Sequence, residues 1–470
     1  MKIEQIYTGC LAQGAYYIES EGEVAIIDPL REVAPYINKA TAENASIKYI
    51  FETHFHADFV SGHVTLAEKT NAPIIYGPNA NPMFKAYIAT DGEEFKLGKL
   101  TLKVLHTPGH TMESTTFLLK DENGKDHAIF TGDTLFLGDV GRPDLAQKAA
   151  DMTQEDLAAL LYDSLRTKIM PLADDVTVYP AHGAGSACGK NMMKETVDTL
   201  GNQKRMNYAL RADMTKAEFV KEVTDGLLPP PAYFPANVRL NKEGYNSIDK
   251  ILQQGTQALS PAAFEAVANE TEALILDTRT PQQFVKGHIP RAIFIGLDGS
   301  FAPWVGALIS DVSQAILLIT DAGREEEAVT RLARVGFDNT IGYLDGGFEA
   351  WQQADKEVDT LLSLAPEMLE QKYETIKDLI FDVRKESEYE AEHIKNAKNV
   401  PLSTLSENIE IFPKNDTFYV HCAGGYRSVI AASILKSRGF HNIIDIKGGF
   451  KKIAKSKLPT TAFVCPSTLI

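Results

Sequence analysis

Cysteine is scarce in this chain, with four residues among 470. The four follow no regular spacing, which argues against a disulfide framework and against a zinc ribbon. A reducing cytoplasm fits this usage, and each thiol has to be judged by its own neighbours. The cysteines are Cys10, Cys188, Cys422 and Cys465.

The chain also lacks long apolar runs and an excess of positive charge. No stretch approaches the roughly 20 apolar residues of a membrane-spanning helix. The first residues show no basic start followed by an apolar run, so no secretory signal is expected. A formal net charge of −16 argues against a nucleic-acid partner, whose phosphates require Lys and Arg. We therefore expect a cytoplasmic protein with no nucleic-acid and no membrane partner.

The composition is that of an ordinary globular protein, with 44% hydrophobic and 23% charged residues. One hydrophobic core does not serve 470 residues, so two to four domains are expected. The first half contains many short apolar strands, separated by polar and Gly/Pro turns and by helical segments. A proline-rich loop, LLPPPAYFPAN, favours an extended conformation before residue 250.

The C-terminal half contains an internal repeat. Each copy alternates short apolar runs with helical patterns, which predicts a parallel sheet with helices on its faces. Two copies of one domain of about 100 residues are the simplest account. We therefore expect three domains, at 1–250, 251–360 and 361–470. The repeated segments are DTR and DVR (277–279 and 382–384), HI (288–289 and 393–394) and GGF (346–348 and 448–450).

Histidines and acids fall where the predicted strands of the first half end. Imidazole and carboxylate are the groups that bind zinc and iron in proteins. One such residue after a strand can simply cap a turn, but four separate strand ends together indicate a metal site. The residues are His54, His56 and Asp58 after YIFET, His110 in TPGHT, Asp133 in TGD and His182 in YPAHG.

The motifs THFHADF, TPGHT, FTGD and YPAHG, in this order, resemble the metallo-β-lactamase superfamily over roughly residues 1–245. The resemblance implies an αββα sandwich with a metal cleft at one edge of its two sheets. The motif set is highly specific for the fold and much less specific for the reaction.

One position departs from the pattern of the two-zinc hydrolases in this superfamily. These enzymes carry a metal-binding histidine after the aspartate, where this chain has Phe59. Losing one ligand of about four weakens the second site, because affinity depends on ligand count and geometry. A single metal on His54, His110 and Asp133 is a two-His, one-carboxylate set, which suits non-haem Fe(II).

The persulfide dioxygenases of the superfamily resemble this chain in that set. The resemblance implies one Fe(II) per chain on the same three residues. The other three candidates, His56, Asp58 and His182, would then orient the ligands and tune the metal.

The segment GDVGRPDL (138–145) resembles the GxGRxD segment of these dioxygenases. Arg142 is then a candidate anchor for an anionic thiol substrate. The alternative is a turn stabilised by a contact between Arg142 and Asp144. The glutathione-dependent branch has a tyrosine after its His-Asp pair, whereas this chain has Ala184 after His182-Gly, so the thiol carrier (glutathione, coenzyme A or another) stays open. Cys188 is expected to be a small buried thiol.

The string HCAGGYRS (421–428) lies between an apolar strand and a helical pattern. Such a loop turns backbone N–H groups inward at a helix N-terminus, which creates an anion pocket. Its positive potential, with Arg427, favours the thiolate form of Cys422 and makes it a nucleophile. We expect Gly424, Gly425 and Tyr426 to contribute to substrate binding.

Four residues separate Cys422 from Arg427, whereas tyrosine phosphatases have five. The shorter loop resembles rhodaneses, sulfurtransferases that carry sulfane sulfur as a cysteine persulfide. The segment FDVRKESEYEAEHIKNAKNVP resembles a rhodanese segment as well, apart from Glu392 where glycine is usual; Lys451 replaces a common aromatic.

The earlier copy also resembles a rhodanese, through DTRTPQQFVKGHIPRAIFI and LDGGFEAW. In its shorter loop, Asp321 aligns with Cys422 and Arg324 aligns with Arg427. A carboxylate cannot accept a sulfur atom as a thiolate does. We therefore expect this copy to be inactive and to have a structural role.

Together these resemblances predict an α/β multidomain enzyme: a metallo-β-lactamase-fold persulfide dioxygenase fused to two rhodanese-like domains with parallel sheets. It would oxidise a small thiol persulfide with O₂ to sulfite and transfer sulfane sulfur between persulfide, sulfite and thiosulfate. A homo-oligomer is expected. The alternatives are a two-zinc thioester hydrolase like glyoxalase II, fused to a sulfurtransferase, and a non-enzymatic persulfide sensor with a decayed metal site.

Overall fold

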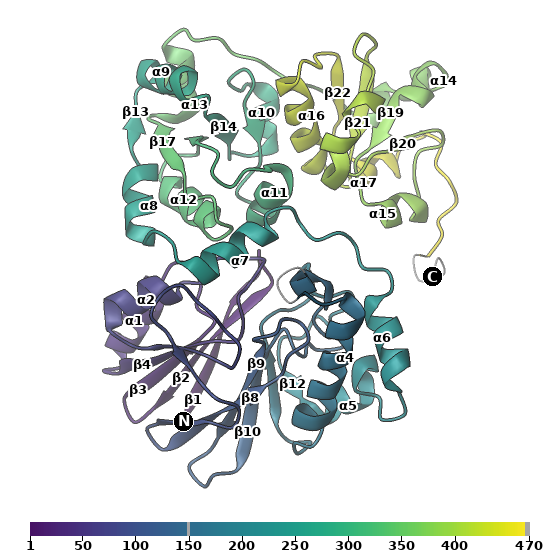
Figure 1. Ribbon diagram of the computed structural model, residues 1–470. Helices are drawn as coiled ribbons and strands as arrows, with labels where there is room; N and C mark the ends of the chain where they lie inside the picture. Colours follow the sequence, from purple (N-terminus) through teal and green to yellow (C-terminus); the bar gives the residue numbers. More distant parts are fainter. Residues whose placement is uncertain (148–150, 466–470) are drawn as a thin grey trace. The chain divides into compact units, whose positions relative to one another are not determined.

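The computed structural model describes residues 1–147 and 151–465 (Figure 1). The chain forms two compact units, of which the first comprises Met1–Lys250 with Leu332–Gly336 and the second comprises the rest of the chain from Ile251 on. The boundaries of the three expected domains stay predictions. Within the described ranges, no helix combines the length and the apolar character that crossing a membrane requires.

The first unit contains two six-stranded sheets. In the first sheet, β1 to β3 are antiparallel and β3 to β6 are parallel; the second sheet is antiparallel except for the β10–β11 pair. The first sheet, in spatial order, consists of β1 (Lys2–Thr8), β2 (Gln13–Ser20), β3 (Glu23–Ile27), β4 (Ser46–Glu52), β5 (Ile74–Tyr76) and β6 (Tyr87–Ile88). The second consists of β12 (Asp198–Thr199), β11 (Thr177–Pro180), β10 (Asp126–Gly132), β9 (Thr115–Lys120), β8 (Leu100–His106) and β7 (Glu94–Leu97).

Helices cover the outer face of each sheet, so that the layers are helix, sheet, sheet, helix (Figure 1). The αββα sandwich expected from the sequence is confirmed. The α-helices of this unit are α1 (Ala34–Ala42) and α2 (His63–Thr70) beside the first sheet, α4 (Gln154–Ser164), α5 (Leu200–Met206) and α6 (Lys216–Thr224) beside the second, and α7 (Phe234–Glu243). A π-helix (Leu165–Ile169) continues α4.

Alternating side chains of β2 show how the sandwich is built. Ala15 and Tyr17 pack in the cluster beneath α1, whereas Tyr16 and Ile18 pack in the cluster between the sheets. All four are buried. Successive side chains of a strand point to opposite faces, so a central strand that is apolar on both faces requires a covered layer on each side.

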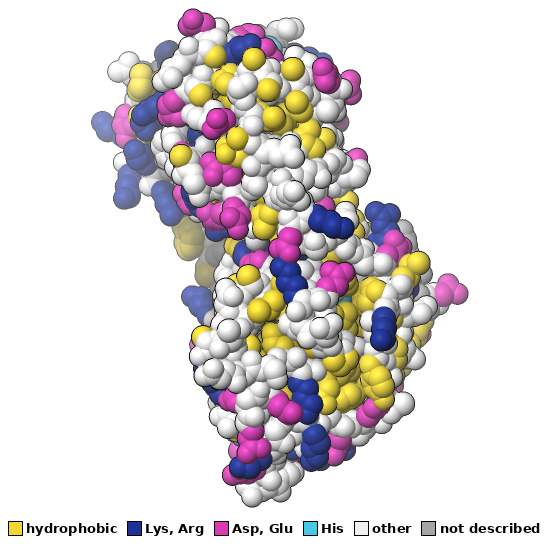
Figure 2. All heavy atoms as spheres, turned by 90° about the vertical axis from the view of Figure 1, so that its left-hand side faces the viewer, with side chains coloured by type: hydrophobic (Ala, Val, Ile, Leu, Met, Phe, Trp, Pro, Cys, Tyr) yellow, Lys and Arg dark blue, Asp and Glu magenta, His cyan; other side chains and the backbone are white. Residues whose placement is uncertain are grey.

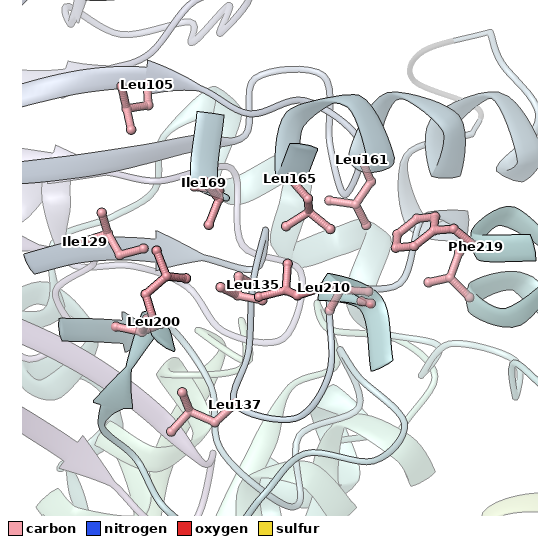
Figure 3. Packing of buried hydrophobic residues seen from close by; sticks show 14 of the residues in the cluster. Leu105, Ile129, Leu135, Leu137, Leu161, Leu165, Ile169, Leu200, Leu210 and Phe219 are labelled. Carbon is pink, nitrogen blue, oxygen red and sulfur yellow. The ribbon is translucent and has the colours of Figure 1, made fainter. Parts of the chain in front are cut away.

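A third cluster lies between the second sheet and its helices (Figure 3). Leu161, Leu165 and Ile169 recur every four residues and therefore lie on one helix face. They pack with Ile129 of β10 and with Leu200 at the start of α5. This packing fixes the second sheet, whose strands β10 and β11 end at the candidate metal ligands.

The C-terminal half forms two five-stranded sheets in which all neighbouring strands, within the described residues, run parallel. Both sheets have the same strand order, which confirms two α/β domains of one fold. One contains, in spatial order, β13 (Ala258–Leu259), β17 (Thr340–Leu344), β16 (Ile316–Ile319), β14 (Leu274–Asp277) and β15 (Ile293–Phe294). The other contains β18 (Leu362–Leu364), β22 (Ile443–Ile446), β21 (Phe418–His421), β19 (Ile380–Asp382) and β20 (Lys398–Asn399).

Helices alternate with these strands along the chain, as the repeat predicts. Those of the first copy are α8 (Ile248–Gly255), α9 (Pro261–Thr271), α10 (Pro281–Lys286), α11 (Phe301–Leu308), α12 (Glu325–Ala333) and α13 (Gly347–Gln353). Those of the second copy are α14 (Tyr373–Ile376), α15 (Glu386–Ala391), α16 (Arg427–Ser437) and α17 (Phe450–Ile453).

The repeated DxR motif forms the same buried ion pair in both copies. Arg279 Nη2 donates to Asp277 Oδ2 at 2.6 Å, and Arg384 Nη2 donates to Asp382 Oδ2 at 2.6 Å. Each guanidinium also donates to the backbone carbonyl just before the HI pair, at 2.9 and 2.7 Å. The motif therefore ties the end of one strand to the segment that leads into the next.

Charges of both signs are interspersed on the molecular face shown in Figure 2. Asp and Glu side chains lie among the Lys and Arg side chains of that face. A phosphate backbone would need an extended basic patch for counter-charge.

We predict that Leu161→Ala destabilises the first unit by about 2–5 kcal/mol, because a buried side chain is removed from a packed cluster. Leu161 is 0% exposed, whereas the control residue Leu228 is 76% exposed and its replacement should have little effect. Urea unfolding followed by circular dichroism measures the change. Both tryptophans, Trp304 and Trp351, lie in the second unit, so their fluorescence should report an unshifted transition. Equal destabilisation by the two substitutions would contradict this packing.

Candidate metal centre and thiol loop

Six buried imidazole and carboxylate groups meet at strand ends of the first unit. Strands β10 and β11 run parallel, so their carboxyl ends reach the same edge of the second sheet. The loop after β4 brings the third contribution to this edge. The groups are His54, His56 and Asp58 after β4, His110 in the turn between β8 and β9, Asp133 after β10, and His182 after β11.

The first set consists of His54, His110 and Asp133. The Nε2 atoms of the two histidines lie 3.8 and 3.4 Å from the same oxygen, Oδ2 of Asp133. One atom from each residue falls within 4.8 Å of the others, a spacing that a single ion can draw together. The structure thus brings together the three residues that the sequence predicts as iron ligands.

The second set consists of His56, Asp58 and His182, again within 4.8 Å of one another. His182 Nε2 lies 3.5 Å from Asp58 Oδ2 and 3.6 Å from Asp133 Oδ1. Asp133 therefore faces the first set with one oxygen and the second set with the other.

A hydrogen-bonded chain behind the first set fixes the ring of His54. Thr53 Oγ1 donates to Asp28 Oδ2 at 2.8 Å, so its lone pair is left to accept from His54 Nδ1 at 3.0 Å. With the proton on Nδ1, the lone pair of His54 Nε2 is directed at the metal position. Asp28 also accepts from the backbone N–H of Thr53, at 2.8 Å.

A backbone contact orients the second imidazole of this set. His110 Nδ1 donates a hydrogen bond to the carbonyl of Arg142 at 2.8 Å, which leaves the lone pair of Nε2 available to bind a metal. The approach requires a glycine before the arginine. A Cβ on Gly141 would lie 2.0 Å from the carbonyl oxygen of Asp133 and 3.0 Å from His110 Nδ1. The glycine and the arginine of the GxGR segment thus serve the metal ligands through the main chain.

The pKa values of two histidines move in opposite directions. Burial lowers the pKa of His54 well below its ordinary value, and neighbouring imidazoles lower it further, so this ring is neutral and able to bind a metal. Burial acts in the same direction on His182, but the carboxylates of Asp58 and Asp133 outweigh it and raise the pKa of His182 to about 9. The site therefore attracts positive charge where the two carboxylates meet.

Unsatisfied polar atoms show that the cluster fits a cation. Among the described residues, both oxygens of Asp133 and both ring nitrogens of His182 are buried without a hydrogen-bond partner. The same holds for Asp58 Oδ1. Buried carboxylate oxygens without partners are costly, and a coordinated metal ion satisfies them. The donor set of nitrogen and oxygen atoms suits iron or zinc.

Phe59 fills the place beside the second set. Its side chain is 0% exposed, and its ring centroid lies 4.4 Å from that of His56 and 6.5 Å from that of His182. The phenyl ring contributes no donor atom there. His56 also turns one nitrogen away, with Nε2 at 3.1 Å from Asp28 Oδ1. The single-metal interpretation stays a prediction, because three donor residues remain in the second set.

Arg142 does not have its guanidinium free for a substrate. Its Nε and Nη2 donate to the two carboxylate oxygens of Asp144, both at 2.7 Å. Nη1 and Nη2 also donate to the carbonyls of Ala187 and Leu228. These contacts favour the alternative interpretation, in which the arginine stabilises a turn. A role as substrate anchor stays a prediction without geometric support.

Cys188 is buried, as expected, and lies at the metal cluster. Its Sγ falls within 4.8 Å of ligand atoms of Asp133 and His182. Burial raises the pKa of this thiol well above its ordinary value, so it stays protonated. Tyr233 is buried nearby, and burial followed by the charge of Asp58 raises its pKa as well.

Sequence reasoning missed several residues that lie near the candidate metal ligands or orient them. Asp28 ends the apolar run VAIID, so it carried the same strand-end signal as the assigned acids. Gly141 lies inside the GxGR motif, but only its contacts reveal its role. Tyr233 follows a proline run, and no pattern in the sequence connects it to the cluster.

The candidate nucleophile of the second unit lies in a backbone cradle. Cys422 follows β21 and is 1% exposed, and the N–H of Gly425 donates to its Sγ at 3.1 Å. Gly425 has φ +97°, which favours glycine. The repeated GGF segment supports the loop from behind: Phe450 N–H donates to the carbonyl of Cys422 at 2.7 Å, and a Cβ on Gly449 would lie 2.3 Å from that oxygen.

The arginine of the loop is paired with a carboxylate. Arg427 donates to the two oxygens of Glu388 at 2.6 and 2.9 Å. Its contribution to the thiolate of Cys422 stays a prediction, because Glu388 balances its charge. Gly424 is exposed, and a Cβ placed on it would meet no described atom within 4 Å, which leaves open space beside the cradle.

The equivalent loop of the first copy is locked by side-chain contacts. Asp321 Oδ1 accepts from Gln283 Nε2 at 2.8 Å. Arg324 donates to Glu327 and to Asp298, both at 2.8 Å. The carboxylate occupies the place of the thiol and is held by its neighbours. The expected lack of sulfur-transfer activity in this copy stays a prediction consistent with these contacts.

Comparison with known proteins identifies the domains. The family model described as the metallo-beta-lactamase superfamily matches residues 8–182, and the rhodanese-like domain model matches residues 260–354 and 365–456. The human protein named persulfide dioxygenase ETHE1, mitochondrial, is 30% identical over 223 residues, which cover 46% of this chain and 79% of that protein. The chain belongs to the metallo-beta-lactamase superfamily.

This superfamily member continues into two rhodanese-like domains. A crystal structure described as a metallo-beta-lactamase from Staphylococcus aureus subsp. aureus COL is similar over 73% of this chain and 98% of its own, with a TM-score of 0.64 and 32% identity. A hydroxyacylglutathione hydrolase of Francisella philomiragia is 34% identical over 36% of this chain and 61% of its own length. The names of these relatives describe different activities. The similarity therefore establishes the family and the domains but does not identify the reaction.

We predict that Thr53→Val weakens metal binding about tenfold to a hundredfold, because the orienting partner of His54 is lost. Thr41→Val is the matched control, since Thr41 is exposed and its hydroxyl donates to a carbonyl of α1. Competition for the metal with a chromophoric chelator measures both affinities. Equal affinities of Thr53→Val and the parent protein would contradict the orienting chain.

Proposed function

We propose that the first unit is an O₂-dependent persulfide dioxygenase with one Fe(II) per chain, and that the second unit is a sulfurtransferase acting through Cys422. The observation that carries the proposal is the convergence of the imidazoles of His54 and His110 on one oxygen of Asp133. His54, His110 and Asp133 are a two-His, one-carboxylate set, which leaves a face open for small reactants. The similarity to the human protein named persulfide dioxygenase supports the reaction class.

The balanced reaction is R–S–SH + O₂ + H₂O → R–SH + SO₃²⁻ + 2 H⁺. A ferrous ion held by His54, His110 and Asp133 would supply the redox chemistry that lets O₂ react with sulfane sulfur. The protein orients the ligands through Thr53 and the Arg142 carbonyl, and it buries them so that bulk water is kept away.

The second unit would use the product of the first. Sulfite attacks the outer sulfur of a Cys422 persulfide: a new S–S bond gives thiosulfate, the old S–S bond breaks, and its electron pair returns to Cys422 as thiolate. The Gly425 N–H, at 3.1 Å from Sγ, stabilises negative charge on the sulfur. One domain thus produces what the other consumes, which gives the fusion a chemical purpose.

Neither site identifies the thiol that carries the persulfide. A low-molecular-weight thiol persulfide, O₂ and sulfite or thiosulfate are the proposed partners, and a cytoplasmic homo-oligomer is the proposed state. Arg142, the candidate anchor for an anionic thiol, donates to Asp144 instead.

A second candidate function is thioester hydrolysis at two zinc ions. The second donor set, His56, Asp58 and His182, together with the similarity to hydroxyacylglutathione hydrolases, favours it. Phe59 counts against it because the ring replaces a donor that a second zinc would use. A sulfurtransferase partner also has no evident use for a thioester product.

We predict that O₂ uptake and sulfur transfer can each be removed without the other. Asp133→Ala should lower persulfide-dependent O₂ uptake at least a hundredfold, because the proposed iron site loses its carboxylate ligand, and should leave thiosulfate:cyanide sulfur transfer within twofold. Cys422→Ser should abolish the transfer and leave O₂ uptake within twofold. An oxygen electrode and a thiocyanate assay provide the two measurements.

Cys465→Ser is the matched control for the thiol, because Cys465 is exposed and lies outside the loop. Thioester cleavage by the parent protein in the absence of persulfide-dependent O₂ uptake would reject the dioxygenase and support the hydrolase. Loss of O₂ uptake in Cys422→Ser would reject the separation of the two sites.

A further inference from the structure

The loop from Cys422 to Arg427 is called the thiol loop here. The side chain of Tyr426 connects it to the first rhodanese-like copy. Tyr426 stands between Gly425, whose N–H contacts Cys422, and the first residue of α16. Its hydroxyl donates to the buried carbonyl of Gly296 at 2.8 Å. Its ring also meets that of Phe294 edge-on, with centroids 5.8 Å apart. All of these residues lie in the second compact unit.

A glycine of the first copy makes room for this ring. A Cβ on Gly299 would lie 2.3 Å from Cζ and 2.6 Å from Oη of Tyr426, and the three nearest atoms all belong to that side chain. A methyl group here would therefore displace the tyrosine without meeting the backbone of its own copy first. The first copy is shaped to accept the tyrosine.

Further contacts hold the same face of α16 against the first copy. The backbone N–H of Phe294 donates to Ser433 Oγ at 3.0 Å, seven residues after Tyr426 and thus on the same helix face. Lys436 Nζ donates to Asp359 Oδ1 at 3.0 Å. The helix whose N-terminus forms the anion pocket is therefore fixed at both ends by residues of the preceding copy and the segment that follows it.

We infer that the copy without a cysteine is a positioning element for the thiol loop, and that it acts through Tyr426. The contact sets the backbone of residues 425 and 426, and with it the N–H that faces the sulfur of Cys422. Tyr426 is thus a positioning residue rather than a group that touches substrate through its side chain. This inference rests on the proposed sulfur transfer and assigns to the inactive copy a part in it.

The step that depends on this positioning is the attack of the Cys422 thiolate on thiosulfate. A bond forms between Sγ and the sulfane sulfur, the S–S bond of thiosulfate breaks, and sulfite leaves with the electron pair. The charge that stays on the sulfur next to the loop requires N–H groups in fixed positions. A loop released from Gly296 loses that arrangement without losing any reacting atom.

The test is Gly299→Ala in the full chain, with Ser300→Ala as the matched control. Ser300 is the adjacent exposed residue, and its side chain makes no capping hydrogen bond to α11. Gly299→Ala should lower kcat of thiosulfate:cyanide transfer about tenfold, as expected for lost packing and one lost hydrogen bond. It should also shift the pH profile of Cys422 alkylation by iodoacetamide to higher pH, read by peptide mass spectrometry.

A double-mutant cycle identifies the route of the effect. Tyr426→Ala should impair transfer as Gly299→Ala does, and Gly299→Ala should add nothing in the Tyr426→Ala background. Tyr426→Phe keeps the ring and should lose only about threefold, from the missing donor. An additive double mutant, or a Gly299→Ala protein with unchanged transfer and pH profile, would overturn the inference.

Two readouts separate other failures from this one. The fluorescence of Trp304 and Trp351, both in the first copy, should keep its thermal transition in Gly299→Ala; an early transition would mean that the first copy unfolds and would also overturn the inference. Absence of sulfur transfer in the parent protein would reject the proposed function, whereas the alkylation profile still tests the positioning of the loop.

Discussion

The carboxylate of Asp133 is the group on which the arrangement of the first unit depends. It is buried at the end of a central strand, with one oxygen toward His54 and His110 and the other toward His182. A buried carboxylate oxygen without a hydrogen-bond partner costs free energy, which a coordinated cation would offset. The αββα packing places the carboxylate at this edge, so metal binding should stabilise the folded first unit.

The two halves of the chain meet the same chemical demand in different ways. Negative charge develops on sulfur in both proposed reactions, and each site meets it with groups that are fixed before the reaction begins. The first unit uses a cation position lined by imidazoles, whereas the thiol loop uses a backbone N–H beside Cys422. In both places a glycine, Gly141 or Gly449, lets main chain approach closely enough to hold the reactive group.

Strand ends explain why much of the site was predictable. His54, His110 and Asp133 all follow apolar runs, the first in one sheet and the other two in the second, and the sandwich that the motifs predict brings these strand ends together. What surrounds them was predictable only in part: the contact of Arg142 with Asp144 was one of two alternatives, whereas nothing in the sequence placed the ring of Tyr426 beside Gly299. Side-chain direction depends on which distant segment packs alongside, and no local pattern records it. Asp28 had the strand-end signal but lacked a histidine beside it in the sequence.

The number of metal ions per chain tests the central claim most directly. Anaerobic titration of metal-free protein with Fe(II), followed by chelator competition, should break at one equivalent in the parent protein. In Phe59→His, where the missing donor is restored beside His56 and Asp58, it should break at two. Two tightly bound ions in the parent protein would contradict the account, because the phenyl ring would then not limit the site to a single metal.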